Sequence, residues 1–190
     1  MKLLVLDNYD SFTYNLVHML RSMNIDHEVY RNDKITSEEA LRFDLIILSP
    51  GPGIPSESGN LQKIISACAG QKPILGICLG HQAIAEYLGA ELVNMTKVYH
   101  GVKSRISLQS DAEMFEDIPE NIQVGRYHSW EVLRENLPES IRITAEDEQG
   151  AIMALSVPSQ KLYGIQFHPE SIMTEHGEQM IRNFIKIAQS

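Results

Sequence analysis

Apolar positions in the first part of the chain follow two periods, which predict a strand and then a helix. The apolar run at residues 2–7 is short and ends in polar residues, which is typical of a buried parallel strand. From residue 12 onward, apolar side chains recur at helical spacing. Ser11 precedes this pattern and is therefore the expected N-cap of the helix. The apolar positions of the helix are Phe12, Leu16, Met19, Leu20 and Met23.

The same alternation continues as far as Gly89 and predicts a doubly wound parallel sheet. Gly89 stands at the position that a C-terminal helix cap prefers. Strands that alternate with helices in this way form an α/β fold with a flavodoxin-like parallel core and helices on both faces. The further strands are expected at residues 27–31, 44–48 and 73–77, and the helices at residues 61–69 and 82–88.

From residue 90 the pattern changes to short strand-like pieces separated by polar turns. We expect antiparallel additions to one edge of the sheet, and then a final helix at residues 176–188. Because no linker, internal repeat or charge block interrupts the chain, residues 1–190 are expected to form a single domain. The expected additional strands lie at residues 103–108, 122–124, 141–145, 151–157 and 162–168.

Composition and charge narrow the function classes. The chain has 190 residues, 43% of them hydrophobic, and a formal net charge of -9, with no run rich in Lys and Arg. Proteins that neutralise nucleic-acid phosphates usually carry a basic surplus, so we expect no nucleic-acid partner. The apolar run at the start is too short for a signal peptide, and no stretch is long enough to span a membrane. We therefore expect a cytoplasmic protein that does not bind membranes.

The first candidate for chemistry is the run G-I-C-L-G at residues 76–80, where a predicted strand meets a predicted helix. It has the form of a nucleophile elbow with Cys78 in the place of the usual serine, and the flanking glycines permit the sharp turn. A helix start supplies N–H groups and a positive dipole end, which stabilise a thiolate. A structural cysteine near a tight turn is the alternative. Cys68 lies among apolar helical positions, so we expect it to serve packing.

The second candidate is the run Q-F-H-P-E at residues 166–170, at the end of a predicted strand. In extended structure, residues two apart project to the same side, so His168 and Glu170 can lie together. A thiol nucleophile needs a base, and a carboxylate improves that base by fixing its tautomer. Alone, the pattern also fits a surface or structural histidine. Together with Cys78, it predicts a Cys-His-Glu triad.

The third candidate is the run S-P-G-P-G at residues 49–53, which follows the strand expected at residues 44–48. It should therefore lie at the carboxyl edge of the sheet, where open α/β sheets bind ligands. Proline has no N–H, so Gly51 and Gly53 are the backbone donors along residues 50–53. One of these N–H groups and that of Leu79 would form an oxyanion hole. A rigid connecting loop is the alternative.

Residues 126–130 form a polar and aromatic cluster, R-Y-H-S-W. By itself, this cluster could be a partly buried corner of the fold. The other histidines of the chain show no mutual spacing typical of a metal site, and we find no H-E-x-x-H pattern or Cys/His quartet. No metal site is therefore expected.

Taken together, four motifs resemble those of the triad (class I) glutamine amidotransferases, in the same order and over essentially the whole chain. This resemblance implies a glutaminase in which Cys78 attacks the side-chain carboxamide of glutamine. His168 would take and return the proton, and Glu170 would orient His168. The motifs are D-N-Y-D-S-F-T-Y-N at residues 7–15, S-P-G-P-G at residues 49–53, G-I-C-L-G-H-Q at residues 76–82 and Q-F-H-P-E-S at residues 166–171.

The resemblance also implies the remaining site residues and the cofactor requirement. The N–H groups of Gly51 and Leu79 would form the oxyanion hole. No cofactor is implied for this chain, and Mg²⁺ is expected on the partner subunit. The residues implied to bind glutamine are Gly51, Pro52, Gly53, Gln82, Ser129 and Trp130.

Within this family, the opening motif is similar to that of the small subunits of two synthases, which pair with a chorismate-binding subunit. The first, anthranilate synthase with its component I, belongs to tryptophan biosynthesis and is favoured here. The second, aminodeoxychorismate synthase with its own component I, belongs to folate biosynthesis and is the alternative. Two departures concern this subgroup: Trp130 stands where leucine is usual, and residues 99–102 replace a usual Met-His-Gly-Lys.

Two further classes of function remain as rivals. A thiol peptidase or γ-glutamyl hydrolase could use the same sheet, although the S-P-G-P-G run and Gln82 favour glutamine as the substrate. A catalytically silent regulatory subunit is the other rival, and the intact Cys78, His168 and Glu170 argue against it.

Overall fold

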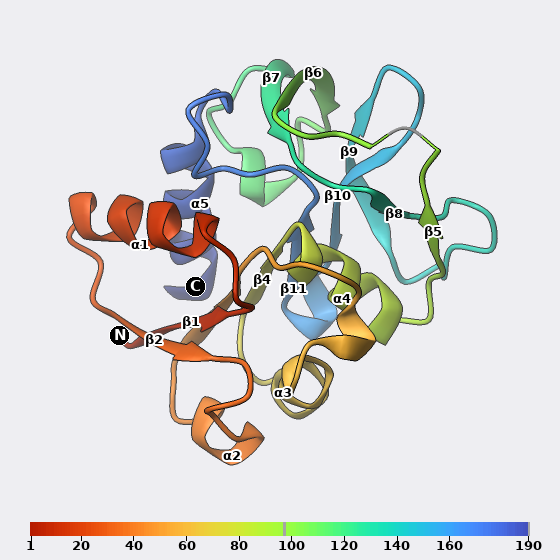
Figure 1. The fold of residues 1–190 in the computed structure, drawn as a ribbon. Helices are drawn as coiled ribbons and strands as arrows, with labels where there is room; N and C mark the ends of the chain where they lie inside the picture. The colour runs from red at the N-terminus through yellow and green to blue at the C-terminus, as the bar shows by residue number, and fades with distance from the viewer. Residues whose placement is uncertain (97, 190) are drawn as a thin grey trace.

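A central mixed sheet organises the part of the chain that a computed structural model describes, residues 1–96 and 98–189 (Figure 1). Its strands are β1 (Leu3–Asp7), β2 (His27–Arg31), β3 (Leu45–Leu48), β4 (Ile74–Ile77), β6 (Val102–Leu108), β7 (Asn121–Arg126), β9 (Arg142–Asp147), β10 (Ile152–Val157) and β11 (Leu162–Ile165). Within the described residues the spatial order is β2-β1-β3-β4-β11-β10-β9-β6-β7. The pairs from β2 to β11 are parallel, and those from β11 to β7 are antiparallel.

Helices and a small second sheet surround the central sheet. The second sheet pairs β5 (Leu92–Asn94) with β8 (Trp130–Val132). None of the helices in the described ranges is long and apolar enough to cross a bilayer. The α-helices are α1 (Phe12–Ser22), α2 (Ser37–Ala40), α3 (Leu61–Cys68), α4 (Leu79–Tyr87) and α5 (Gly177–Gln189), and the 3-10 helices are η1 (Pro55–Glu57), η2 (Glu113–Phe115) and η3 (Pro158–Gln160).

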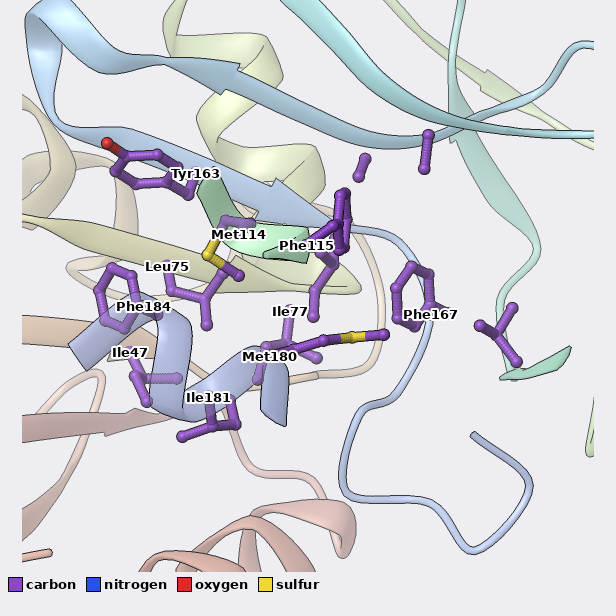
Figure 2. Packing of buried hydrophobic residues seen from close by; sticks show 14 of the residues in the cluster. Ile47, Leu75, Ile77, Met114, Phe115, Tyr163, Phe167, Met180, Ile181 and Phe184 are labelled. Atoms are coloured by element: carbon purple, nitrogen blue, oxygen red, sulfur yellow. The ribbon is translucent and has the colours of Figure 1, made fainter. Parts of the chain in front are cut away.

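The parallel strands are buried on both faces, which explains their continuous apolar runs. In β1, Leu3 and Val5 pack into the layer that contains α1 and α5, whereas Leu4 and Leu6 pack into the layer that contains α3 and α4. Figure 2 shows the first layer, in which α5 lies against β3, β4 and η2. Its labelled side chains include Met180, Ile181, Phe184, Ile47, Leu75, Ile77, Met114 and Phe115.

The predicted fold class is confirmed, with a parallel core, antiparallel strands added at one side, and helices on both faces. Gly89 also has the positive φ, 96°, that its expected capping position requires. One local expectation is confirmed in position only. Ser11 occupies the N-cap position of α1, but its side chain makes no capping hydrogen bond. Instead, Asp10 Oδ1 accepts from the Phe12 N–H at 2.7 Å.

Element ends differ from the pattern where the backbone turns sharply. The helix expected from residue 82 begins at Leu79, because Cys78 itself occupies the N-cap position. The strand expected at residues 162–168 ends at Ile165. Three short elements, α2, β5 and β8, were not predicted, because their four, three and three residues are too few to establish a period.

One buried polar side chain lies between α4 and the sheet. His81 is fully buried against β11, where a Cβ on Gly164 would come within 2.8 Å of His81 Nδ1. Neither ring nitrogen of His81 reaches a partner with hydrogen-bond geometry among the described residues. Burial lowers the pKa of His81 to about 4, and the nearby Gly164 backbone offsets only part of that effect. His81 is therefore held neutral in the folded chain.

This burial predicts acid sensitivity. The unfolded chain protonates His81 near pH 6.5, but the folded chain does so near pH 4, so its stabilising contribution is complete above about 6.5 and falls as the pH decreases. Between these values, His81 should contribute about 1.4 kcal/mol per pH unit to the slope of the unfolding free energy. We expect His81→Leu and His81→Gln to remove this contribution, as measured by urea unfolding across the range. Unchanged slopes in both variants would contradict the assignment.

Candidate active site

Three neighbouring parallel strands carry the candidate residues. β3, β4 and β11 lie side by side, with Leu48 opposite Gly76 and Ile77 opposite Ile165. Their carboxyl ends therefore meet at one edge of the sheet. The loop at residues 49–53 follows β3, Cys78 follows β4, and residues 166–170 follow β11. The topology thus brings together the three segments predicted to form the site.

Cys78 occupies a strained turn between β4 and α4. Its φ is 52° and its ψ is -100°, a conformation that L-residues rarely adopt. The Cys78 N–H donates to the Ile165 carbonyl at 2.9 Å, which anchors the turn to β11. A Cβ on Gly76 would lie 2.3 Å from the backbone of Gly80, so the glycines permit the close approach. These features are those of the predicted nucleophile elbow, although Cys78 is only 6% exposed.

His168 and Glu170 form the pair that the spacing predicted. His168 Nδ1 donates to Glu170 Oε1 at 2.7 Å, and both side chains are buried. The expected geometry was wrong, because these residues are in a turn beyond β11 and not in an extended strand. The Ser171 N–H donates to the His168 carbonyl at 3.2 Å, and Thr174 Oγ1 donates to the same carbonyl at 2.6 Å. The turn thus brings the two side chains together.

The ring of His168 interacts with Cys78 and packs in a cluster with two aromatic side chains. Its Nε2 is buried and has no hydrogen-bond partner of good geometry among the described residues. Burial alone would lower the pKa of His168, but interactions with Cys78 and then Glu170 outweigh burial and raise the pKa to about 10. Phe12 and Tyr127 approach the His168 ring with centroid distances of 4.7 and 4.9 Å. The site can therefore stabilise an imidazolium beside the sulfur atom.

The Gly51 loop lies against the elbow. A Cβ on Gly51 would come within 2.4 Å of Leu79 Cδ2 and 2.7 Å of Asn8 Cβ. The Asn8 N–H donates to Ser49 Oγ at 2.9 Å, and Asn8 Nδ2 donates to the Ser49 carbonyl at 2.8 Å. Pro52 and Gly53 are exposed farther along this loop. The motif at residues 7–15 thus supports the loop through Asn8.

Gln82 on α4 meets the segment that contains Ser129 and Trp130. Gln82 Nε2 donates to the Trp130 carbonyl at 2.9 Å, and also to Gln166 Oε1 at 3.1 Å. The Ser129 carbonyl accepts from the Met95 N–H at 2.8 Å. The structure therefore brings all the predicted glutamine-binding segments to the same region.

Cys68 and the histidines elsewhere contrast with this site. Cys68 is fully buried on α3, and burial raises its pKa to about 11, which makes it a poor nucleophile. In the described ranges, no group of three or more His, Cys, Asp or Glu side chains is arranged to hold a metal ion.

Several side chains that contact the site had no role predicted from the sequence. Gln166 donates to Cys78 Sγ at 3.6 Å, and Arg126 Nε donates to His128 Nε2 at 3.0 Å. Phe12 and Tyr127 contact the His168 ring. All of these residues lie in the R-Y-H-S-W run, the Q-F-H-P-E run or the motif at residues 7–15. Membership in a motif was therefore the sequence signal that could have identified them, whereas their contacts are known only from the tertiary structure.

Comparisons with known proteins agree on one family. The family model described as "Glutamine amidotransferase class-I" matches residues 4–188. A Cyanophora paradoxa protein named anthranilate synthase component 2 is 45% identical over 186 residues, which are 96% of this chain and 97% of the relative. A Bacillus subtilis protein named aminodeoxychorismate/anthranilate synthase component 2 is 43% identical over 186 residues, which are 97% of this chain and 95% of the relative.

A solved structure gives the same picture of the fold. The protein from Thermoplasma acidophilum described as a subunit of GMP synthase superposes with a TM-score of 0.89 at 31% sequence identity. The match covers 100% of this chain and 94% of that protein.

The carboxylate of Glu170 should control the charge of His168. In Glu170→Gln, the charged partner is lost, and we expect the pKa of His168 to fall by about one to two units. A titration followed by NMR of ring-labelled histidine would measure this shift. The exposed Glu178 on α5 provides the control variant Glu178→Gln. An unchanged His168 titration in Glu170→Gln would contradict the pairing.

Proposed function

The chain belongs to the class-I glutamine amidotransferase family, and we propose that it is the glutaminase subunit of a chorismate-using synthase. In this role it hydrolyses glutamine to glutamate and ammonia, and delivers the ammonia to its partner subunit. The observation that carries the proposal is the juxtaposition of Cys78 with the bonded pair of His168 and Glu170. We also propose that residues 1–190 act as one domain and need no cofactor of their own.

In the first half of the reaction, the Cys78 thiolate attacks the carboxamide carbon of glutamine. The negative charge that develops on the carboxamide oxygen is stabilised by the N–H groups of Gly51 and Leu79. The carbon–nitrogen bond then breaks, and the His168 imidazolium gives its Nε2 proton to the leaving nitrogen. Ammonia departs, a γ-glutamyl thioester remains on Cys78, and His168 becomes neutral.

In the second half, neutral His168 takes a proton from water as the water oxygen attacks the thioester carbon. The carbon–sulfur bond breaks, glutamate leaves, and the Cys78 thiolate and the imidazolium are restored. Glu170 keeps the Nδ1 proton of His168 in place through the 2.7 Å hydrogen bond. Neither half of the reaction requires an external oxidant or reductant.

Glutamine would be held by the loop and the segment that flank the elbow. We assign Gly51, Pro52 and Gly53 to one side, where a Cβ on Gly51 has no room. The amide nitrogen of Gln82 is already engaged by Trp130 and Gln166, so its carbonyl oxygen is the group that would accept a hydrogen bond from substrate. The backbone of Ser129 and Trp130 would hold the amino-acid end.

The partner and pathway follow from the names of the relatives. We propose that the partner is the chorismate-binding component I of anthranilate synthase, which places the complex in tryptophan biosynthesis and in the cytoplasm. Any Mg²⁺ would belong to that partner. The aminodeoxychorismate synthase partnership of folate biosynthesis is a second candidate, because one relative's name includes both activities. Copurification from the source cells, followed by identification of the product formed from chorismate and glutamine, distinguishes the two.

Cys78→Ser is the sharpest test of the glutaminase assignment. In the assembled enzyme, it should abolish glutamine-dependent synthesis but spare synthesis from added ammonium salts, because the partner needs only ammonia. Cys68→Ser is the matched control and should change only packing, since Cys68 is fully buried on α3. If Cys78→Ser retained most glutamine-dependent turnover, the nucleophile would be misassigned. Glutamine turnover and peptide hydrolysis by the wild-type chain separate a glutaminase from a thiol peptidase.

The site is nearly closed, which predicts that partner binding activates it. Cys78, His168 and Glu170 are 6%, 2% and 8% exposed, so glutamine must move covering groups to reach the sulfur atom. We expect kcat/KM for glutamine to rise at least about tenfold when the chain docks on its chorismate-bound partner. Steady-state assays on the isolated chain and on the complex measure this ratio. Equal values in both would eliminate activation by the partner.

A further inference from the structure

A continuous chain of hydrogen bonds ends on the sulfur atom of Cys78. The Trp130 carbonyl accepts from Gln82 Nε2 at 2.9 Å, and Gln82 Nε2 also donates to Gln166 Oε1 at 3.1 Å. Gln166 Nε2 then lies 3.6 Å from Cys78 Sγ, within the range of a hydrogen bond to sulfur. Gln82 is 3% exposed and Gln166 is fully buried, so water does not compete strongly for these contacts.

The Trp130 carbonyl determines the donor and acceptor of every hydrogen bond in this series. A backbone carbonyl can only accept, so Gln82 must present its NH₂ group to Trp130. The second hydrogen of that NH₂ group requires an acceptor, and so Gln166 must present Oε1 to Gln82. The NH₂ group of Gln166 is then left facing Cys78. A flipped amide at Gln82 or Gln166 would place two acceptors or two donors against each other.

A second group of side chains holds the Trp130 carbonyl. Arg126 is a donor only, so the 3.0 Å contact from its Nε requires His128 Nε2 to be an unprotonated acceptor. His128 Nδ1 then carries the proton and donates to the Trp130 carbonyl at 2.9 Å. Burial and the Arg126 charge lower the pKa of His128 to about 3, so this neutral tautomer persists. Arg126 is fixed in turn by Asp147 at 2.6 Å.

We propose that Gln166 is a catalytic residue that donates a hydrogen bond to the Cys78 sulfur atom and stabilises its thiolate form. Gln82 is a positioning residue for it, in addition to its role toward substrate. The donor acts whenever charge resides on sulfur, in the resting site and when the thiolate leaves the thioester. A donor aimed at a charged atom in a dry site has a larger effect than one in water.

The role of the Gln166 hydrogen bond in turnover rests on the proposed function. The hydrogen bond itself can be tested without glutamine or a partner. The full chain with Cys68→Ser retains Cys78 as its single thiol. Its thiolate is titrated by ultraviolet absorbance against pH, with the protein lacking both thiols as the blank. The titratable groups that face Cys78 are His168 and Glu170, which is bonded to His168. Both residues stay unchanged in every variant.

Gln166→Leu removes the donor, and we expect the thiolate midpoint to rise by about one pH unit, or about tenfold less thiolate below the midpoint. Gln166→Glu keeps the bulk and the acceptor for Gln82 but places a carboxylate against sulfur, so it should raise the midpoint further. Gln82→Leu should shift the midpoint in the same direction by releasing the Gln166 amide. Gln62→Leu is the matched control, because Gln62 donates to Ala83 and Glu86 on α4 without contacting Cys78.

A wild-type midpoint in Gln166→Leu would overturn the proposal, and an equal shift in Gln62→Leu would overturn it in favour of a packing effect. A wild-type midpoint in Gln82→Leu would overturn the positioning role of Gln82. If Gln166→Leu fails to fold, Gln166→Met takes its place, because it also lacks the donor and adds no charge: the same rise supports the proposal, and a wild-type midpoint overturns it. A shifted midpoint in a chain that hydrolyses no glutamine with its partner would leave this inference standing while the proposed function failed.

Discussion

The site depends on one close contact, the approach of α4 to the strands at two glycines. A Cβ on Gly76 would lie 2.3 Å from the Gly80 backbone, and a Cβ on Gly80 would lie 2.6 Å from the Leu48 carbonyl oxygen. Without these side chains, α4 can begin directly after β4 and leave Cys78 at the turn with a φ of 52°. Such a conformation costs on the order of 1–3 kcal/mol and persists only when its surroundings hold it. The hydrogen bond to Ile165 and the packed elbow provide that support.

The register of β11 against β4 then determines which side chains can meet Cys78. Because Ile77 pairs with Ile165, Cys78 and Gln166 leave the sheet side by side. Gln82 on α4 lies close enough to bond to Gln166. Buried amides cost free energy unless they are hydrogen-bonded, so losing one member leaves its neighbours unsatisfied. A chain of buried amides therefore favours one arrangement of the elbow over looser ones.

Much of the fold could be predicted from the sequence because its central elements carry strong periods. Buried runs such as residues 45–48 identified the parallel strands, and the glycines around Cys78 identified the elbow. The H-x-E spacing predicted that His168 and Glu170 pair. It did not predict that a turn, rather than an extended strand, brings them together. The contact of Gln166 with Cys78 joins residues 88 positions apart. Such a contact depends on strand order and register, which no local pattern encodes.

The motif at residues 7–15 contributes to the site without carrying its chemistry. Asn8 bonds to Ser49 at the start of the loop that contains Gly51, whereas Phe12 contacts the His168 ring, so one short segment links the proposed oxyanion loop to the proposed base. The Phe12 and Tyr127 ring centroids also lie 4.6 Å apart, and the Tyr127 hydroxyl group bonds to Ser171 Oγ. A displacement of the Phe12 ring would therefore change the packing of His168 and, through the start of α1, the support of the Gly51 loop. The contacts of this segment thus join the packing around His168 to the position of the Gly51 loop.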